Sequence, residues 1–160
     1  MLLAHILLLI PCESLICDYR SEMHSEVDYD SPKRLVEMHG GRLRIVIVED
    51  NYDAAEALKM LLELYGHSPT VIADGLAAID AVRDGAFEIG LVDIGLPGID
   101  GYEVARRIRE IPNAKTMTLV ALTGYGQETD KQRALSAGFD EHLTKPVKVE
   151  RLQAVLNRPR

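Results

Sequence analysis

The chain has 160 residues, which is enough for one domain with a substantial core but hardly enough for two. Its contents of 47% apolar and 27% charged residues are those of an ordinary soluble protein. The formal net charge of −7 argues against a nucleic-acid binder, which needs a basic surface to neutralise phosphates.

The first 41 residues differ from the rest in charge and in pattern. Residues 1–40 carry seven acids against three bases, whereas residues 41–160 carry eighteen against fifteen. The apolar run MLLAHILLLI at residues 1–10 resembles a signal-peptide core, but it lacks a basic start and is shorter than the roughly 20 residues that span a bilayer. Both cysteines, Cys12 and Cys17, lie in this segment, so the body has no disulfide framework or cysteine zinc site. We expect residues 1–41 to be a disordered or non-native leader, the alternatives being a weak membrane anchor at residues 1–16 or a real part of the fold.

From residue 42 onward, short apolar runs alternate with segments of helical period. Strands are expected at residues 43–48, 68–72, 87–92, 117–122 and 139–143. Helices are expected at residues 52–65, 75–83, 101–110, 127–137 and 147–157. The helix starts are expected at Asn51 and Asp74, and helix ends at Gly66 and Gly138. The residues expected to face the core are Ala54, Ala57, Leu58, Leu61 and Leu64 on the first helix, and Ala78, Ile79 and Val82 on the second.

This alternation predicts a doubly wound α/β fold with five parallel strands and five helices. Strands joined by helical crossovers run parallel, and their apolar runs indicate burial on both faces. In such open sheets the functional site lies beyond the carboxyl ends of the strands. The site is therefore expected among the residues that follow each strand.

Four of the five predicted strands end in polar residues suited to chemistry. These residues are Glu49 and Asp50 after the first strand, Asp93 after the third, Thr123 after the fourth and Lys145 after the fifth. Two unit charges about 4 Å apart repel by about 4 kcal/mol at an effective dielectric near 20, so three carboxylates at one edge need a cation. Lys145 supplies one positive charge, and ligands that are all oxygen point to Mg²⁺ or Mn²⁺ rather than zinc.

Asp93 is the candidate nucleophile of this site. It precedes a loop rich in glycine and proline, and a carboxylate can attack phosphorus to form an aspartyl phosphate. The metal and Lys145 would neutralise phosphoryl oxygens, and Thr123 could donate a hydrogen bond to one of them. Gly124 leaves room for the group.

Four motifs, in this order and spacing, resemble the receiver domain of two-component response regulators. They are IVIVEDN (45–51), LVDIGLPGIDGYEVARRIR (91–109), LVALTGYG (119–126) and AGFDEHLTKPV (137–147). The resemblance covers about residues 43–156 and implies a receiver domain over 42–160 with a flavodoxin-like strand order of 2-1-3-4-5. It also implies that Asp93 is the phosphoacceptor, that Thr123 and Lys145 bind the phosphoryl group, and that the Lys145–Pro146 bond is cis. The implied Mg²⁺ ligands, with Mn²⁺ as an alternative ion, are Glu49, Asp50, Asp93 and the backbone carbonyl of Gly95.

Two positions depart from the commonest pattern of that family. His142 stands where the family has a switch aromatic on the fifth strand, and an ordinary packed residue is an equal alternative. Tyr125, two residues after Thr123, either shields the phosphoryl group from water or is a surface aromatic.

The resemblance implies a cytoplasmic signalling protein that is not an enzyme beyond its own phosphorylation and dephosphorylation. It would take a phosphoryl group from the phosphohistidine of a histidine kinase or phosphotransfer protein. The signal would pass to an unknown protein, and not to nucleic acid or an attached output domain. The contact surface would be the face of the fourth helix, fifth strand and fifth helix, including His142, Lys148 and Arg151. We expect Arg106, Arg107 and Arg109 to form a solvated helix face.

Two other functions and one fragment stay as alternatives. A constitutive interaction module would keep the fold without phosphorylation, and a phosphatase of the aspartyl-phosphate type would need a second Asp where Gly95 stands. KRLVEMHGGR (33–42) is either a helical turn ended by two glycines or a piece resembling the ATP-binding domain of histidine kinases. The rest of that domain is missing, so no kinase activity is expected, and an origin in a hybrid kinase is the hypothesis.

Overall fold

The computed structural model describes residues 41–124 and 128–158. The expectations for the leader, for most of KRLVEMHGGR and for Tyr125 lie outside these residues. Within the described part of the chain, no helix is both long and apolar enough to cross a membrane.

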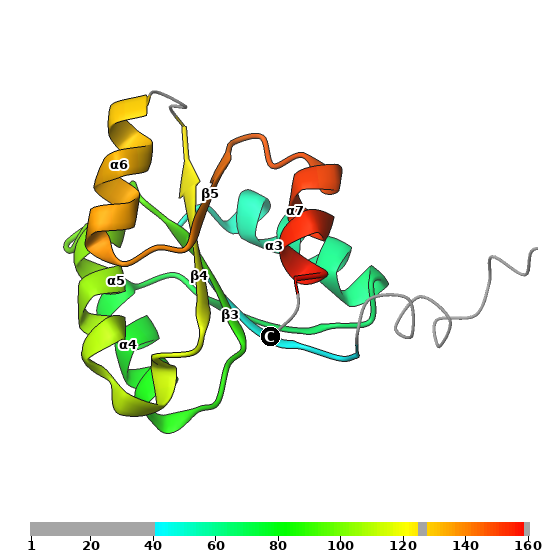
Figure 1. Ribbon diagram of the computed structural model, residues 1–160. Coiled ribbons are helices and arrows are strands. Elements are labelled where there is room, and N and C mark those ends of the chain that lie inside the picture. The colour runs from blue at the N-terminus through cyan, green and yellow to red at the C-terminus, as the bar shows by residue number, and fades with distance from the viewer. Residues whose placement is uncertain (1–40, 125–127, 159–160) are drawn as a thin grey trace, which may run out of the picture. The chain divides into compact units, whose positions relative to one another are not determined.

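Five parallel strands form one sheet in the order β2-β1-β3-β4-β5, as predicted (Figure 1). The strands are β1 (Arg44–Val48), β2 (Ser68–Ile72), β3 (Ile89–Asp93), β4 (Thr118–Thr123) and β5 (Glu141–Thr144). The helices are α3 (Tyr52–Leu64), α4 (Gly75–Asp84), α5 (Gly101–Glu110), α6 (Glu128–Ala137) and α7 (Val149–Leu156). A short 3₁₀ turn, η1 (Pro112–Ala114), precedes β4 and was not predicted.

The sheet separates two hydrophobic cores because successive residues of each strand point to opposite faces. Val46 and Val48 of β1 pack with α4, α5 and α6, whereas Ile45 and Ile47 of the same strand pack with α3 and α7. Figure 1 shows the same arrangement, with α4, α5 and α6 on one side of the sheet and α3 and α7 on the other. The carboxyl ends of β1, β3, β4 and β5 are thereby left free to carry a site.

The helix signals in the sequence were confirmed at several termini. The side chain of Asn51 accepts a hydrogen bond from the backbone N–H of Ala54 at 3.0 Å, and Asp74 accepts one from Ala77 at 2.8 Å. Gly66 and Gly138 follow α3 and α6 with φ angles of 80° and 101°, the left-handed conformation that commonly ends a helix.

The predicted buried face of α4 is confirmed, whereas that of α3 is correct for Leu58 and Leu61 and wrong for the exposed Ala54, Ala57 and Leu64. The buried residues of α3 are Ala55, Leu58 and Leu62, and the predicted Leu64 is 66% exposed. Apolar residues occur on several sides of α3, so the 3.6-residue period fits more than one face. Only packing against the sheet selects the buried face.

Strands β1, β3, β4 and β5 start one or two residues later than predicted, and one arginine was misplaced. Phe139 lies in the turn that ends α6 rather than in β5, and its N–H donates to the carbonyl of Ala134 at 3.1 Å. β3 likewise begins at Ile89 rather than at residue 87. Arg109 is not part of a solvated face: its guanidinium donates to the carbonyls of Gly138 at 2.8 Å and Met117 at 2.7 Å.

Candidate functional site

Three carboxylates meet at the carboxyl edge of the sheet, as the sequence predicted. Val48 lies opposite Val92 in the β1–β3 pairing, so Glu49 and Asp93 emerge from neighbouring strands. Oxygen atoms of Glu49, Asp50 and Asp93 all lie within 4.8 Å of one another. Glu49 and Asp93 are buried, at 3% and 8% exposed, whereas Asp50 is exposed. The cluster is therefore half desolvated and open to solvent on the side of Asp50.

Lys145 connects the two buried carboxylates. Its Nζ lies 2.5 Å from Oε2 of Glu49 and 3.1 Å from Oδ1 of Asp93. Burial on its own lowers the pKa of Lys145, but the hydrogen bonds to Glu49 and Asp93 outweigh it, so the pKa is raised above the usual value. Lys145 therefore carries its charge at neutral pH and offsets one of the three carboxylates.

The ends of β4 and β5 place Thr123 and Lys145 side by side. The backbone N–H of Lys145 donates to the carbonyl of Thr123 at 2.8 Å, and Thr123 is buried at 7% exposed. The Lys145–Pro146 peptide bond is cis, as predicted. A Cβ atom added to Gly124 would meet nothing within 4 Å, so the space that the sequence predicted beside Thr123 is present.

Two glycines lie against Asp93, and the sequence singled out only one of them for the site. A Cβ atom added to Gly95 would lie 3.4 Å from Oδ2 of Asp93, so the backbone of Gly95 runs beside the carboxylate. A Cβ atom added to Gly101 would lie only 2.2 Å from the carbonyl oxygen of Asp93. The start of α5 is thus in direct contact with the backbone of Asp93. The Asp-Gly pair ahead of a predicted helix is the signal that could have indicated this contact.

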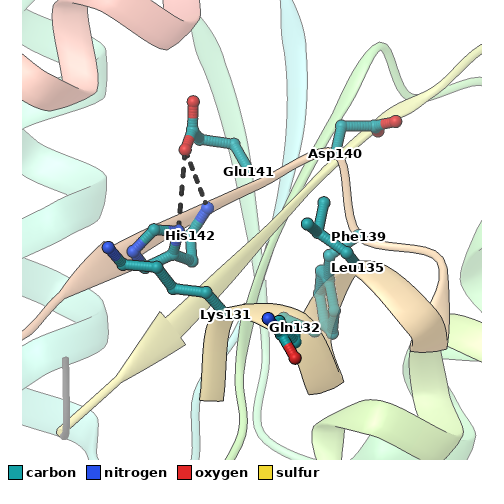
Figure 2. Close-up of a pocket in the computed structure, with 8 residues that line it drawn as sticks. Lys131, Gln132, Leu135, Phe139, Asp140, Glu141 and His142 are labelled. Atoms are coloured by element: carbon teal, nitrogen blue, oxygen red, sulfur yellow. Dashed lines mark hydrogen bonds and ion pairs between the residues drawn. The ribbon is translucent and has the colours of Figure 1, made fainter. Parts of the chain in front are cut away.

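His142 lies on β5, next to the site but outside the carboxylate cluster. It pairs with Ala121 on β4, two residues before Thr123, and therefore projects from the same face of the sheet as Thr123. Together with side chains of α6 it lines a cavity of about 220 Å³, shown in Figure 2. Its Nδ1 lies 3.7 Å from Oε1 of Glu141.

Lys148 and Arg151 extend this surface along α7. With His142 they line a smaller cavity of about 70 Å³ between β5 and α7. Arg151 also lies 3.8 Å from Glu141. The predicted signalling residues therefore do lie on one continuous surface.

The donor set fits a magnesium ion. All the candidate side-chain ligands are carboxylate oxygens, and the exposure of Asp50 leaves room for the water ligands that Mg²⁺ usually keeps. A parallel sheet with an acidic cluster, a lysine and a threonine at its carboxyl edge defines the class of doubly wound phosphoryl-accepting domains.

Comparison with known proteins identifies the family. The response regulator receiver domain family matches residues 45–157, and the chain belongs to this family. Receiver domains in general are the phosphoacceptors of two-component signal transduction.

Relatives and solved structures agree with this assignment. The chain is 37% identical over 114 residues to the transcriptional regulatory protein TcrA of Mycobacterium tuberculosis, an alignment covering 71% of this chain and 44% of TcrA. It spans less than half the length of several such curated regulators.

Two solved structures are informative about ligands and partners. The receiver domain of the sensor histidine kinase PA1611 of Pseudomonas aeruginosa, which has a magnesium ion coordinated in its active-site cleft, is 32% identical with a TM-score of 0.67. The similarity covers 72% of this chain and 95% of that chain. The receiver domain of Ssk1 from Saccharomyces cerevisiae, in a co-crystal with the histidine phosphotransfer protein Ypd1, is 27% identical with a TM-score of 0.68, covering 72% and 86%.

Proposed function

We propose that Asp93 is the phosphoacceptor of this receiver domain, which begins near Arg42, and that its donor is the phosphohistidine of a histidine kinase or phosphotransfer protein. The observation that carries the proposal is the position of Asp93, buried in the acidic cluster and 3.1 Å from the ammonium group of Lys145. The Ypd1 complex of a similar receiver domain supports this class of donor.

In the proposed reaction an oxygen of Asp93 attacks phosphorus while the bond from phosphorus to the histidine nitrogen breaks. Lys145 already touches Asp93, so its ammonium group can follow the negative charge onto the phosphoryl oxygens. The hydroxyl of Thr123 would donate to another phosphoryl oxygen, with the open space at Gly124 receiving the group. The chemistry is limited to this self-catalysed transfer and to hydrolysis of the acyl phosphate.

The proposed cofactor is Mg²⁺, with Mn²⁺ as an alternative, held by Glu49, Asp50, Asp93 and the carbonyl of Gly95. When bound, it supplies positive charge that offsets the phosphoryl oxygens and the carboxylates. Glu49 enters this arrangement already hydrogen-bonded to Lys145, so lysine and metal share the neutralisation of the buried acids. The magnesium ion in the similar PA1611 receiver domain supports the assignment.

The proposed output is a change in the face formed by α6, β5 and α7. Thr123 and His142 project from the same side of neighbouring strands, so a movement of Thr123 toward a phosphoryl group would be transmitted to His142. A downstream protein would then contact this face, including Lys148 and Arg151.

Phosphorylation of the intact protein by acetyl phosphate with Mg²⁺ tests the proposal. Intact-mass measurement should show a gain of one phosphoryl group, which disappears without Mg²⁺ and in Asp93→Asn. Asp74→Asn is the matched control: Asp74 also follows a strand at this edge but caps α4, and asparagine caps equally well. The control variant should be phosphorylated normally.

No mass gain in the wild-type protein, or a gain that persists in Asp93→Asn, would contradict the proposal. The first of these results would favour a constitutive interaction module, in which the fold acts without phosphorylation.

A further inference from the structure

Among its described residues, helix α6 buries fewer apolar side chains than the other helices of the domain. Its buried described residues are the alanines Ala134 and Ala137, whereas Leu135 is 62% exposed. By contrast, α7 buries Leu152, Val155 and Leu156. Because α6 buries only small side chains among its described residues, polar contacts must contribute much of what fixes its position.

One of these contacts, made by Arg109 of α5, anchors the carboxyl end of α6. Its guanidinium donates to the carbonyl of Gly138, to that of Met117 just before β4, and at 2.5 Å to the carboxylate of Asp140. The same carboxylate oxygen of Asp140 accepts the N–H of Leu119 at 2.8 Å. With a side chain only 22% exposed, Arg109 joins the end of α6 to the sheet through several charge-assisted hydrogen bonds.

A second arginine, Arg133, attaches the middle of α6 to the start of α5. Its guanidinium carbon lies 4.2 Å from the centre of the Tyr102 ring, and its Nη2 lies 3.8 Å from Oδ2 of Asp100. The side chain of Arg133 is 65% exposed, so these contacts are much weaker than those of Arg109. Asp100 and Tyr102 flank Gly101.

Gly101 connects this attachment to the phosphorylation site. Its N–H donates to the carbonyl of Ile94 at 3.1 Å, and its Cα approaches the backbone of Asp93 so closely that no side chain fits between them. A displacement of the backbone at Asp93 must therefore move Gly101, and with it the two groups that hold Arg133.

We propose that α6 can rotate about its carboxyl end, which the hydrogen bonds of Arg109 hold in place; we call Arg109 the pivot. The contacts of Arg133 with Tyr102 and Asp100 hold the rest of the helix, and we call Arg133 the latch. Phosphorylation of Asp93 breaks the contacts of the latch. The proposal rests on the proposed function for its last step. Release lets the amino-terminal part of α6 move while Gly138 stays in place. This movement changes the cavity between α6 and β5 that Leu135 and His142 line (Figure 2).

Residue-resolved amide hydrogen exchange of the full chain tests the latch without phosphorylation. Arg133→Gln should exchange about three- to tenfold faster at residues 132–134, the effect expected for losing an exposed cation–π contact and an ion pair. The amides of Gly138 and Phe139 should be unchanged. Arg106→Gln is the matched control, since Arg106 is similarly exposed but pairs only within α5, at 3.0 Å from Glu103. If residues 132–134 exchange at the same rate in Arg133→Gln as in the wild type, Arg133 is not a latch.

The pivot is tested by Arg109→Lys, which keeps the charge but cannot reach three acceptors at once. Faster exchange at Gly138 and Phe139 is expected. Should that variant fail to fold, Asp140→Asn removes the ion pair while keeping an acceptor for Leu119, and should give a smaller acceleration in the same direction. Unchanged exchange at Gly138 and Phe139 in a folded variant would overturn the pivot.

The last arm adds beryllium fluoride and Mg²⁺ as a stable stand-in for the phosphoryl group. Exchange at residues 132–134 should rise in the wild type and change little further in Arg133→Gln. If Asp93 gains a phosphoryl group by mass but α6 exchange does not respond, the release step is wrong while the proposed function stands. If Asp93 gains none, the proposed function fails, and the unphosphorylated variants still decide whether the latch and pivot exist.

Discussion

Gly101→Ala is a demanding test of how α5 is joined to the phosphorylation site. In the interior of an isolated helix this change is stabilising, because alanine is favoured over glycine by about 1 kcal/mol, and this is the upper limit of the gain at the first residue of α5. Here the new Cβ would lie 2.2 Å from the carbonyl oxygen of Asp93, 2.8 Å from Cα of Ile94 and 3.0 Å from the carbonyl carbon of Asp93. All three are backbone atoms that cannot rotate away. Overpacking of this kind costs about 1–3 kcal/mol and at times more, and we expect the upper end.

The net effect expected for Gly101→Ala is a loss of about 2 kcal/mol, or a fall in Tm of roughly 5–10 °C for a domain of this size. Thermal unfolding followed by far-ultraviolet circular dichroism measures it. Gly95→Ala is the matched control, since its Cβ would make an ordinary 3.4 Å contact with Asp93, and its Tm should stay close to that of the wild type. The reasoning is refuted if Gly101→Ala melts within about 2 °C of the wild type, or if Gly95→Ala falls equally far.

Three further predictions concern a helix cap, an acid-sensitive pair and the metal. Asn51→Ala should lower the free energy of unfolding in urea by about 1 kcal/mol because the cap is lost, whereas Asn51→Ser should retain most of it; equal losses would contradict this. Burial on its own raises the pKa of Glu88, but its hydrogen bonds to Arg44 lower it below the usual 4.5. The stability from this pair is therefore present above pH 4.5 and lost as the pH falls through the lowered pKa. Urea unfolding at several pH values should show a shallower loss in acid for Glu88→Gln, and an identical slope would argue against the pair. Mg²⁺ should raise the Tm of the wild type by binding the folded state, and Glu49→Gln should reduce that rise; an undiminished rise would remove Glu49 from the metal site.

Much of the fold and the membership of the site could be predicted from the sequence. The alternation of apolar runs and helical segments requires parallel strands, and parallel strands bring their carboxyl ends to one edge. Glu49, Asp93 and Lys145 were therefore predicted to meet although they are far apart in the chain, and they do. Local capping signals at Asn51 and Asp74 were equally dependable, because a cap involves only neighbouring residues.

Other features depended on packing between distant segments. The buried face of α3 was predicted only in part because its sequence is apolar on several sides, and the position of the sheet selects among them. Arg109 looks like its exposed neighbours Arg106 and Arg107 in the sequence. Its role in holding Gly138 and Asp140 follows only from where α5 lies relative to β5.

The sequence alone therefore establishes which chemical groups lie at the carboxyl edge, since strand direction is a property of local pattern and connectivity. Tertiary structure decides how those groups are used. It buries Glu49 and Asp93 while leaving Asp50 exposed, and it places the ammonium group of Lys145 between the two buried acids. It also presses Gly101 against Asp93, a contact whose closeness depends on the approach of α5 to β3.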